Sequence, residues 1–307
     1  MRFDDLLNTF ANNLLPILTL CGAGFLLGRA LTIDSRSLGR VVFYVFTPVL
    51  VFNQLLHNNL PLDDILRTVG FTVSVIAAMV TLAWLFGRLM RFDRPTLMAV
   101  LITVGFGNTG NYGLPLVNFA FGADALSHAT LFFVTTSILF NTVGVLLASL
   151  GHTDFRNALL GLLRVPTVYA VILGAALNQF RVSLPLPIER TVQLAADGSI
   201  PLMLVLLGVE LSRLQWSDSR RAIGLSAGLR LLAGPLVGLL LAIPFGLRGA
   251  AWQGDVIQSS MPAAVNNTVL AAEYRLNSSL VTGIVFLGTL LSPITLTLLL
   301  VYLGGGG

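Results

Sequence analysis

The sequence is poor in charge, contains no lysine and has a single cysteine. Only 10% of its 307 residues are charged, whereas 55% are hydrophobic, and the mean hydropathy is +0.85. A soluble globular domain carries far more charge, so water is not the main solvent of this chain. The lone Cys21 excludes an intramolecular disulfide and a cysteine-based metal site. These absences indicate a protein embedded in a membrane.

Long apolar runs are what the sequence has instead. A helix that crosses about 30 Å of hydrocarbon needs roughly 20 mostly apolar residues, and about ten such runs can be drawn between charged or turn residues. We therefore predict an all-α membrane protein with function inside the membrane, because no connecting segment is long enough for a soluble domain. The expected spans are approximately 11–28, 37–56, 67–88, 95–120, 125–149, 159–178, 190–210, 221–244, 249–273 and 278–302.

The basic residues are all arginines, and most of them lie at span ends on one side. With the N-terminus outside, the cytoplasmic side holds Arg29, Arg36, Arg40, Arg88, Arg91, Arg94, Arg156, Arg164, Arg213, Arg220, Arg221 and Arg275. The other side holds Arg2, Arg67, Arg181, Arg190 and Arg248. This bias predicts a multi-pass protein of the cell (inner or plasma) membrane with both termini outside. The arginines form no run, which argues against nucleic-acid binding.

Prolines recur at a spacing of about 150 residues, the mark of an internal repeat. The pairs are Pro16 and Pro166, Pro48 and Pro201, and Pro115 and Pro262. We predict two similar halves, residues 1–150 and 151–307, with five spans each. Because five is odd, the second half enters the membrane from the opposite face. Such inverted repeats are typical of carriers with alternating access.

The fourth and ninth expected spans carry helix-breaking and amide residues at corresponding positions. Proline removes a backbone donor, and lipid cannot satisfy the freed groups, so both helices are expected to unwind beside protein or a hydrated cavity. Paired broken helices indicate a carrier binding site, because half-helix N-termini attract anions. The candidate substrate-binding residues here are Asn108, Thr109, Asn111, Pro115, Pro262, Asn266 and Asn267.

A simpler interpretation exists for each broken segment taken alone. A glycine-rich membrane helix can merely pack closely against its neighbours while its asparagines bond to adjacent helices. Polar groups at this depth are costly. Their occurrence at matching positions of both halves therefore favours a binding site.

The same segments resemble the auxin efflux carrier (PIN-like) family, which includes bacterial organic-anion permeases such as malonate transporters. Asn108-Thr109 followed by Pro115 resembles the fourth-helix crossover of that family, and Met261-Pro262 resembles the ninth. The likeness extends along the whole chain. The long cytoplasmic loop of the plant hormone-exporting members is missing here, so the resemblance implies a bacterial metabolite rather than auxin as the substrate.

The resemblance also implies a division of labour between spans. The first, second, sixth and seventh spans, about 11–56 and 159–210, would form a dimeric scaffold. The others, about 67–149 and 221–302, would form a mobile transport domain. A substrate carboxylate would sit at the X-shaped crossover and move by an elevator-like displacement. The expected partners are a small organic anion, the bilayer and a second copy of the chain.

Four residues within the spans are candidates for electrostatic roles. Arg230 could neutralise a substrate carboxylate, or its side chain could snorkel to the cytoplasmic interface. Asp197 and Asp255 could bind a coupling proton or sodium ion, or line a hydrated end or pair with an arginine. Gln258 could supply an oxygen to sodium. No cofactor is expected beyond such a coupling ion.

Rival functions have weaker sequence support. The three histidines His57, His128 and His152 fall near expected span ends, are unpaired by spacing and predict no metal site. The sequence has no H-E-x-x-H, no nucleotide loop and no Ser/His/Asp grouping on facing helices, so we do not expect an enzyme. A channel or a membrane-embedded sensor using the same crossover is the serious alternative to a carrier.

Overall fold

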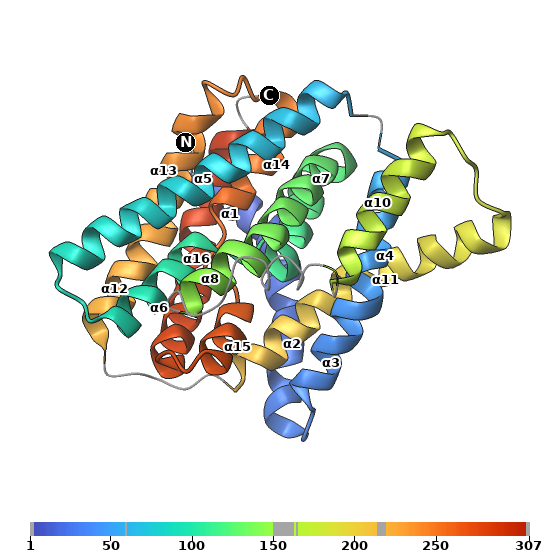
Figure 1. Ribbon diagram of the computed structural model, residues 1–307. Helices are drawn as coiled ribbons and strands as arrows, with labels where there is room; N and C mark the ends of the chain where they lie inside the picture. The colour runs from blue at the N-terminus through green and yellow to red at the C-terminus, as the bar shows by residue number, and fades with distance from the viewer. Residues whose placement is uncertain (1–2, 59, 150–162, 164, 214–218, 305–307) are drawn as a thin grey trace.

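The chain folds into helices throughout the part that the computed structural model describes, which is residues 3–58, 60–149, 163, 165–213 and 219–304 (Figure 1). The first half of the molecule contains α1 Phe3–Thr9, α2 Leu15–Ala30, α3 Ser35–Val41, α4 Thr47–Leu56, α5 Leu62–Leu89, α6 Arg94–Gly105, α7 Leu114–Leu139 and α8 Val145–Ala148. The second contains α10 Pro166–Gln179, α11 Leu186–Leu211, α12 Arg220–Gly228, α13 Gly234–Ala242, α14 Gly249–Ser259, α15 Asn266–Glu273 and α16 Ser278–Gly304.

Wider π-helical turns interrupt several of these helices. They are η1 Phe10–Leu14, η2 Val42–Phe46, η3 Thr109–Gly113, η4 Phe140–Gly144 and η5 Leu229–Ala233. Four of them lead directly into a helix whose second residue is proline, namely Pro16, Pro48, Pro115 or Pro235. Proline lacks an N–H and its ring clashes with the carbonyl one turn earlier. A widened turn relieves that clash, and such π turns often lie at functional sites.

Seven segments of the described chain are long and apolar enough to cross a membrane. They are Asp4–Ala30, Ser35–Leu56, Leu62–Leu89, Thr109–Ala148, Leu186–Leu211, Arg220–Ala242 and Ser278–Gly304. The multi-pass all-α membrane fold is therefore confirmed. The count of ten crossings and the repeat stay predictions. The boundary between the halves and the start of the sixth expected span lie outside the described residues.

The expected fourth and ninth spans are shorter helices joined by breaks. Arg94–Gly105 is an apolar helix of 12 residues, and α14 and α15 have 11 and 8 residues. Gly122, with φ 77° and ψ −163°, divides α7 within the long segment Thr109–Ala148. The boundary expected between residues 120 and 125 therefore coincides with a glycine in a backbone conformation that L side chains rarely adopt.

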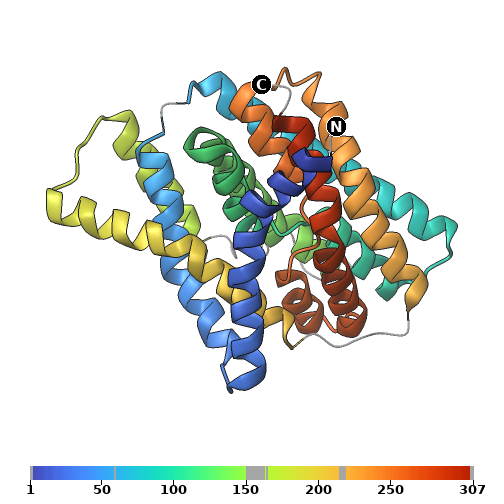
Figure 2. The ribbon, with the colours of Figure 1, turned by 180° about the vertical axis from the view of Figure 1, so that it is seen from behind.

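Two groups of helices lie side by side in both ribbon views (Figures 1 and 2). The smaller group consists of α2, α3, α4, α10 and α11, in which α2 packs on α11 and α4 packs on α10 and α11. The larger group consists of α5 to α8 and α12 to α16, in which α14 packs on α7 and α13, and α5 on α6 and α7. The groups touch where α11 contacts η3 and α7 and where α4 contacts α7.

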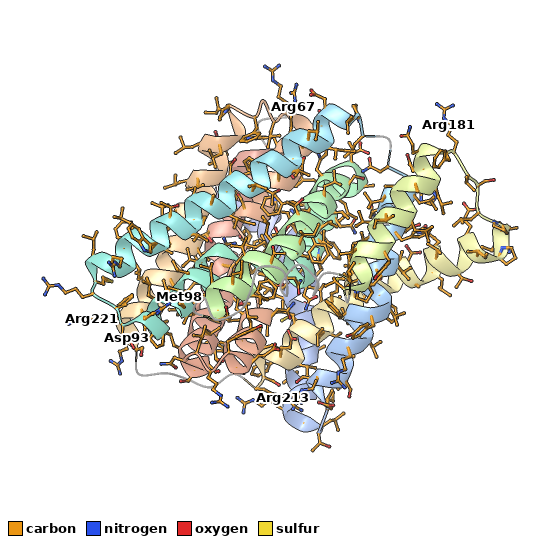
Figure 3. The ribbon with its side chains drawn as sticks, in the orientation of Figure 1. Arg67, Asp93, Met98, Arg181, Arg213 and Arg221 are labelled. Atoms are coloured by element: carbon orange, nitrogen blue, oxygen red, sulfur yellow. The ribbon has the colours of Figure 1, made fainter. Side chains whose placement is uncertain are left out.

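The arginines separate toward two ends of the molecule. Arg67 and Arg181 project at one end, and Arg213 and Arg221 lie toward the other (Figure 3). The sequence places the first pair outside and the second pair in the cytoplasm. The separation agrees with that arrangement. The orientation itself stays a prediction.

Candidate functional site

The two broken segments cross each other and are joined through their backbones. The helix α6 ends before Phe106, which is extended, and α14 ends before the non-helical stretch 260–265. The amide of Asn108 donates to the carbonyl of Pro262 over 2.7 Å, and the amide of Ala264 donates to the carbonyl of Phe106 over 3.2 Å. Gly107 and Ala263 form an antiparallel bridge between them. The freed backbone groups therefore satisfy each other away from lipid.

Two of the asparagines predicted to bind substrate, Asn108 and Asn267, are buried at this crossover, and each has a side-chain polar atom without a hydrogen-bond partner among the described residues. The Nδ2 of Asn267 donates to the carbonyl of Phe106 over 3.0 Å. Its Oδ1 has no hydrogen-bond partner among the described residues, and neither has the Nδ2 of Asn108. A buried polar atom without a partner costs free energy, which a ligand that bonds to it recovers. The two side chains thus offer a ligand one hydrogen-bond acceptor, Oδ1 of Asn267, and one donor, Nδ2 of Asn108.

The other predicted binding residues are not all at the crossover. Pro262 is buried there, and so is Thr109, whose carbonyl accepts from the Nε2 of Gln258 over 3.1 Å. Pro115 is buried at the start of α7. Asn111 is half-buried and Asn266 is exposed. The structure therefore brings Asn267 into the crossover while its neighbour faces outward.

Arg230 reaches the crossover from the π turn η5. Its guanidinium is buried, with Nε donating to the carbonyl of Met261 over 2.8 Å and Nη1 to that of Val104 over 3.1 Å, while Nη2 also bonds to Met261. Of the two alternatives left open by the sequence, the snorkelling one is wrong. Gly107 permits this approach, because a Cβ at that position would overlap the guanidinium.

A small cavity lies beside the guanidinium. Its volume is about 10 Å³, and Gly107, Thr109, Arg230, Gln258 and Ser259 contribute to its lining. Such a space holds about one water molecule. A carboxylate-bearing metabolite is larger and would fit here only if the surrounding helices moved apart.

A larger cavity of about 640 Å³ lies at the ends of α4, α10 and α11 in the smaller group. Asn178, on its wall, donates from Nδ2 to the carbonyls of Leu56 and Asn58 over 2.7 Å. None of the buried polar atoms that lack a partner in the described chain belongs to this lining. All of these atoms except Oε2 of Glu210 on α11 lie instead within the larger group, which favours the crossover as the site.

The two aspartates proposed for a coupling ion have different surroundings. Asp197 is exposed on α11 and accepts from the Nε2 of Gln193 over 2.7 Å, so the structure does not bring it to the crossover. Asp255 is fully buried on α14, and its Oδ2 accepts from the hydroxyl of Thr68 over 2.8 Å. Gln258 follows one turn later and also donates to the carbonyl of Ala129 over 3.1 Å.

Two residues near this aspartate are not among those that the sequence predicts for the site. One is Thr68 itself. The other is His128, which is expected near a span end and is unpaired by spacing with the other histidines. It is buried, and its Nδ1 lies 3.2 Å from the Thr68 hydroxyl. One signal was available. Each of these two residues and Asp255 lies six residues after Leu62, Gly122 or Gly249, where a helix begins or α7 is broken.

Comparison with known proteins places the whole chain in one family. The sequence profile described as "Membrane transport protein" matches residues 9–155 and 155–300. An "Uncharacterized transporter" of Methanothermobacter thermautotrophicus is 28% identical over 267 residues, which cover 86% of this chain and 88% of that protein. The "Putative malonate transporter" of Rhizobium meliloti is 26% identical over 307 residues, 95% of each chain.

A plant relative matches a shorter part of the sequence. "Auxin efflux carrier component 3a" of Oryza sativa subsp. japonica is 30% identical over 143 residues, which cover 44% of this chain and 23% of that protein. The family profile, by contrast, covers nearly the entire chain in two segments. The chain therefore belongs to the membrane transport protein family of the auxin efflux carriers.

Proposed function

We propose that this transporter moves small organic anions, mono- or dicarboxylates of the malonate type, by secondary active transport. The substrate carboxylate binds at the crossover of the two broken helices, next to Asn108, Asn267 and Arg230. An elevator-type displacement then carries it across the membrane. The malonate in the name of the Rhizobium meliloti relative supports a dicarboxylate as the first probe.

One observation carries the proposed anion site. Arg230 is 3% exposed, and no carboxylate forms an ion pair with it in the part of the chain that the structure describes. Backbone carbonyls bond to its N–H groups, but they leave its full charge buried. Burying an uncompensated cation costs free energy. An anionic ligand offsets that cost, and a planar guanidinium suits a carboxylate in particular.

The grouping of helices supports the elevator mechanism. Every element of the crossover, namely α6, η3, η5, α14 and α15, belongs to the larger group. Large apolar side chains are exposed on both groups, for example Leu194 at 77% on the smaller and Leu240 at 66% on the larger. We propose that the smaller group is the scaffold of a homodimer and that the larger group moves against it. A coupled ion, sodium or a proton, would supply the driving force.

Counterflow in proteoliposomes tests the carrier function. Vesicles loaded with unlabelled malonate are diluted into labelled malonate, with empty vesicles and vesicles containing Asn12→Ala as controls, since Asn12 is exposed on η1. We expect saturable, transient accumulation of label in the wild type and in Asn12→Ala. Asn108→Ala is expected to abolish it while leaving a folded protein, because it removes the free amide.

The alternatives give different results in the same assay. A channel would pass label without saturation and without transient accumulation. A sensor would bind malonate without flux. If a panel of mono- and dicarboxylates, tested with and without sodium and a pH gradient, shows no counterflow for any member, the proposed substrate class is wrong.

A further inference from the structure

A buried carboxylate on α14 has no role in the crossover itself. Asp255 is 0% exposed, its Oδ2 accepts from the hydroxyl of Thr68 on α5, and its Oδ1 has no hydrogen-bond partner among the described residues. An ionised carboxylate in such surroundings carries a large desolvation penalty, which protonation removes. Asp255 is therefore suited to bind and release a proton.

The Thr68 hydroxyl links this carboxylate to a buried imidazole. Its oxygen lies 2.8 Å from Oδ2 of Asp255 and 3.2 Å from Nδ1 of His128 on α7. A hydroxyl has one hydrogen to donate and can accept another hydrogen bond. When His128 holds the proton, Nδ1–H donates to Thr68 and Thr68 donates to the Asp255 carboxylate. When Asp255 holds it, both hydrogen bonds point the other way.

The two arrangements interconvert without loss or gain of atoms. The Nδ1 hydrogen of His128 passes to the Thr68 oxygen while the Thr68 hydrogen passes to Oδ2 of Asp255. One proton is thereby moved from the imidazolium ring to the carboxylate, which leaves a neutral imidazole and a neutral carboxyl group. Three side chains from three helices thus form a complete relay for a single proton.

The relay lies between one face of the protein and the crossover. Its members each lie six residues, or about 9 Å along a helix, beyond a helix start or break. Thr68 follows Leu62, His128 follows Gly122 and Asp255 follows Gly249 at this spacing. Gln258, one turn beyond Asp255, donates to the carbonyl of Ala129 next to His128 and to that of Thr109 in the crossover. A movement of the relay is therefore transmitted to the crossover through the side-chain amide of Gln258.

Close helix packing holds the relay together. A Cβ at Gly254 would overlap the carbonyl of Ala125, so α14 lies against α7 at a distance that only glycine allows. The helices α5, α7 and α14 all belong to the larger group. The relay thus moves with the crossover in any displacement of that group.

No arginine forms an ion pair with Asp255 in the part of the chain that the structure describes. The helices packed against α14 are α5, α7, α13 and α16, with the turn η3. Of these, α13, α16 and η3 contain no charged residue. The charged groups at the relay end are Asp63, Asp64 and Arg67 on α5, Asp124 on α7 and Arg248 before α14. Arg67 pairs with exposed Asp63 over 2.6 Å, and Arg88 lies at the far end of α5.

We propose that Asp255, Thr68 and His128 form the proton-binding site that couples this transporter to a proton gradient. The inference rests on the proposed carrier function. An imidazole nitrogen binds a proton well, whereas hard cations such as sodium are held by several oxygens. Among the described residues of the relay only Thr68 and Asp255 offer side-chain oxygens, so the chemistry favours a proton.

Two transport assays on the same vesicles test the coupling. With the membrane potential clamped and no sodium present, one pH unit supports about tenfold accumulation of labelled malonate per coupled proton. We expect Asp255→Asn to lose this accumulation and to keep malonate counterflow, because exchange does not require the proton to leave. The matched control is Asp124→Asn, an exposed carboxylate on the neighbouring helix. Accumulation by Asp255→Asn equal to the wild type, or accumulation driven by sodium alone, would overturn the proposal.

Infrared titration of the purified proteins in lipid gives a readout that needs no substrate. We expect a protonated-carboxyl band that titrates in the wild type and in Asp124→Asn and is missing in Asp255→Asn. Thr68→Val, which keeps both titratable groups, should shift the midpoint of this band. If the wild type shows no malonate counterflow, the proposed function fails while the infrared band still decides the proton site. Identical bands in all variants would refute the relay.

Discussion

The backbone amide of Asn108 donates to the backbone carbonyl of Pro262 over 2.7 Å, so the main chain itself joins the two interrupted helices. This contact leaves the Nδ2 of Asn108 free of protein partners in the described chain. The backbone contact between the two helices therefore does not depend on the side-chain amide of Asn108. Side-chain substitutions should therefore separate binding from folding.

The neighbouring asparagines of α15 provide the sharpest substitution pair. Asn267 is buried and donates to the carbonyl of Phe106, whereas Asn266 is exposed. Asn267→Ala should abolish malonate counterflow and lower stability by about 1 kcal/mol, because the carbonyl of Phe106 loses one of its two hydrogen-bond donors. Asn266→Ala should retain transport and melting temperature. Equal losses in both variants would contradict the placement of the site on the buried face of α15.

A methyl group at Gly107 tests the position of Arg230. The added Cβ of Gly107→Ala would overlap the guanidinium and displace it from the crossover. We expect the KM for malonate to rise by about tenfold or more, the equivalent of 1.4 kcal/mol of binding, with the protein still folded. Gly22→Ala is the control, because a Cβ there meets nothing within 4 Å. An unchanged KM would mean that the guanidinium does not contact the substrate.

The crossover could be predicted from sequence because its signals are local. Proline, glycine and amide residues cluster within a few residues of Pro115 and Pro262, and this local pattern predicts a helix break without any knowledge of the surrounding helices. Gly122 likewise falls in the expected gap between two spans. The faces of the short helix α15 could not be predicted, since Asn266 and Asn267 differ only in which side of one turn they occupy. Tertiary packing decides that choice.

The proton relay could not be predicted because its parts are distant in sequence. Thr68 lies 60 residues from His128 and 187 from Asp255. These three residues come together only because of how α5, α7 and α14 pack, and a single sequence does not specify that packing. The same limit applies to Arg230, which the sequence places within a span without fixing the direction of its side chain.

A close crossing of α2 and α11 in the smaller group can be followed with the only cysteine of the sequence. Gly208 lies so near the carbonyl of Cys21 that a Cβ would overlap it, and Cys21 is 9% exposed. Gly208→Val should cost about 1–3 kcal/mol through overpacking. It should also make maleimide labelling of Cys21 faster and lower the temperature at which that labelling begins. Gly224→Val, where a Cβ meets nothing within 4 Å, should leave both unchanged. Slow labelling in Gly208→Val would show that the two helices can separate without exposing Cys21.

Asp34, in the loop between α2 and α3, predicts a pH-dependent helix start outside the membrane. Its Oδ2 accepts from the hydroxyl of Ser37 over 2.6 Å and its Oδ1 from the amide of Arg36 over 3.1 Å. The Ser37 hydrogen bond, followed by that of Arg36, lowers the pKa of Asp34 below its ordinary value. Because the folded pKa is the lower one, the cap stabilises α3 fully above about pH 4 and is lost as the pH falls through the lowered value.

Amide exchange at Arg36, corrected for its intrinsic rate, should accelerate on acidification in the wild type. It should do so at a higher pH in Ser37→Ala, which lacks the stronger hydrogen bond, and show no such step in Asp34→Asn, which has no carboxyl to titrate. The same midpoint in the wild type and Ser37→Ala would show that the hydroxyl does not control this cap.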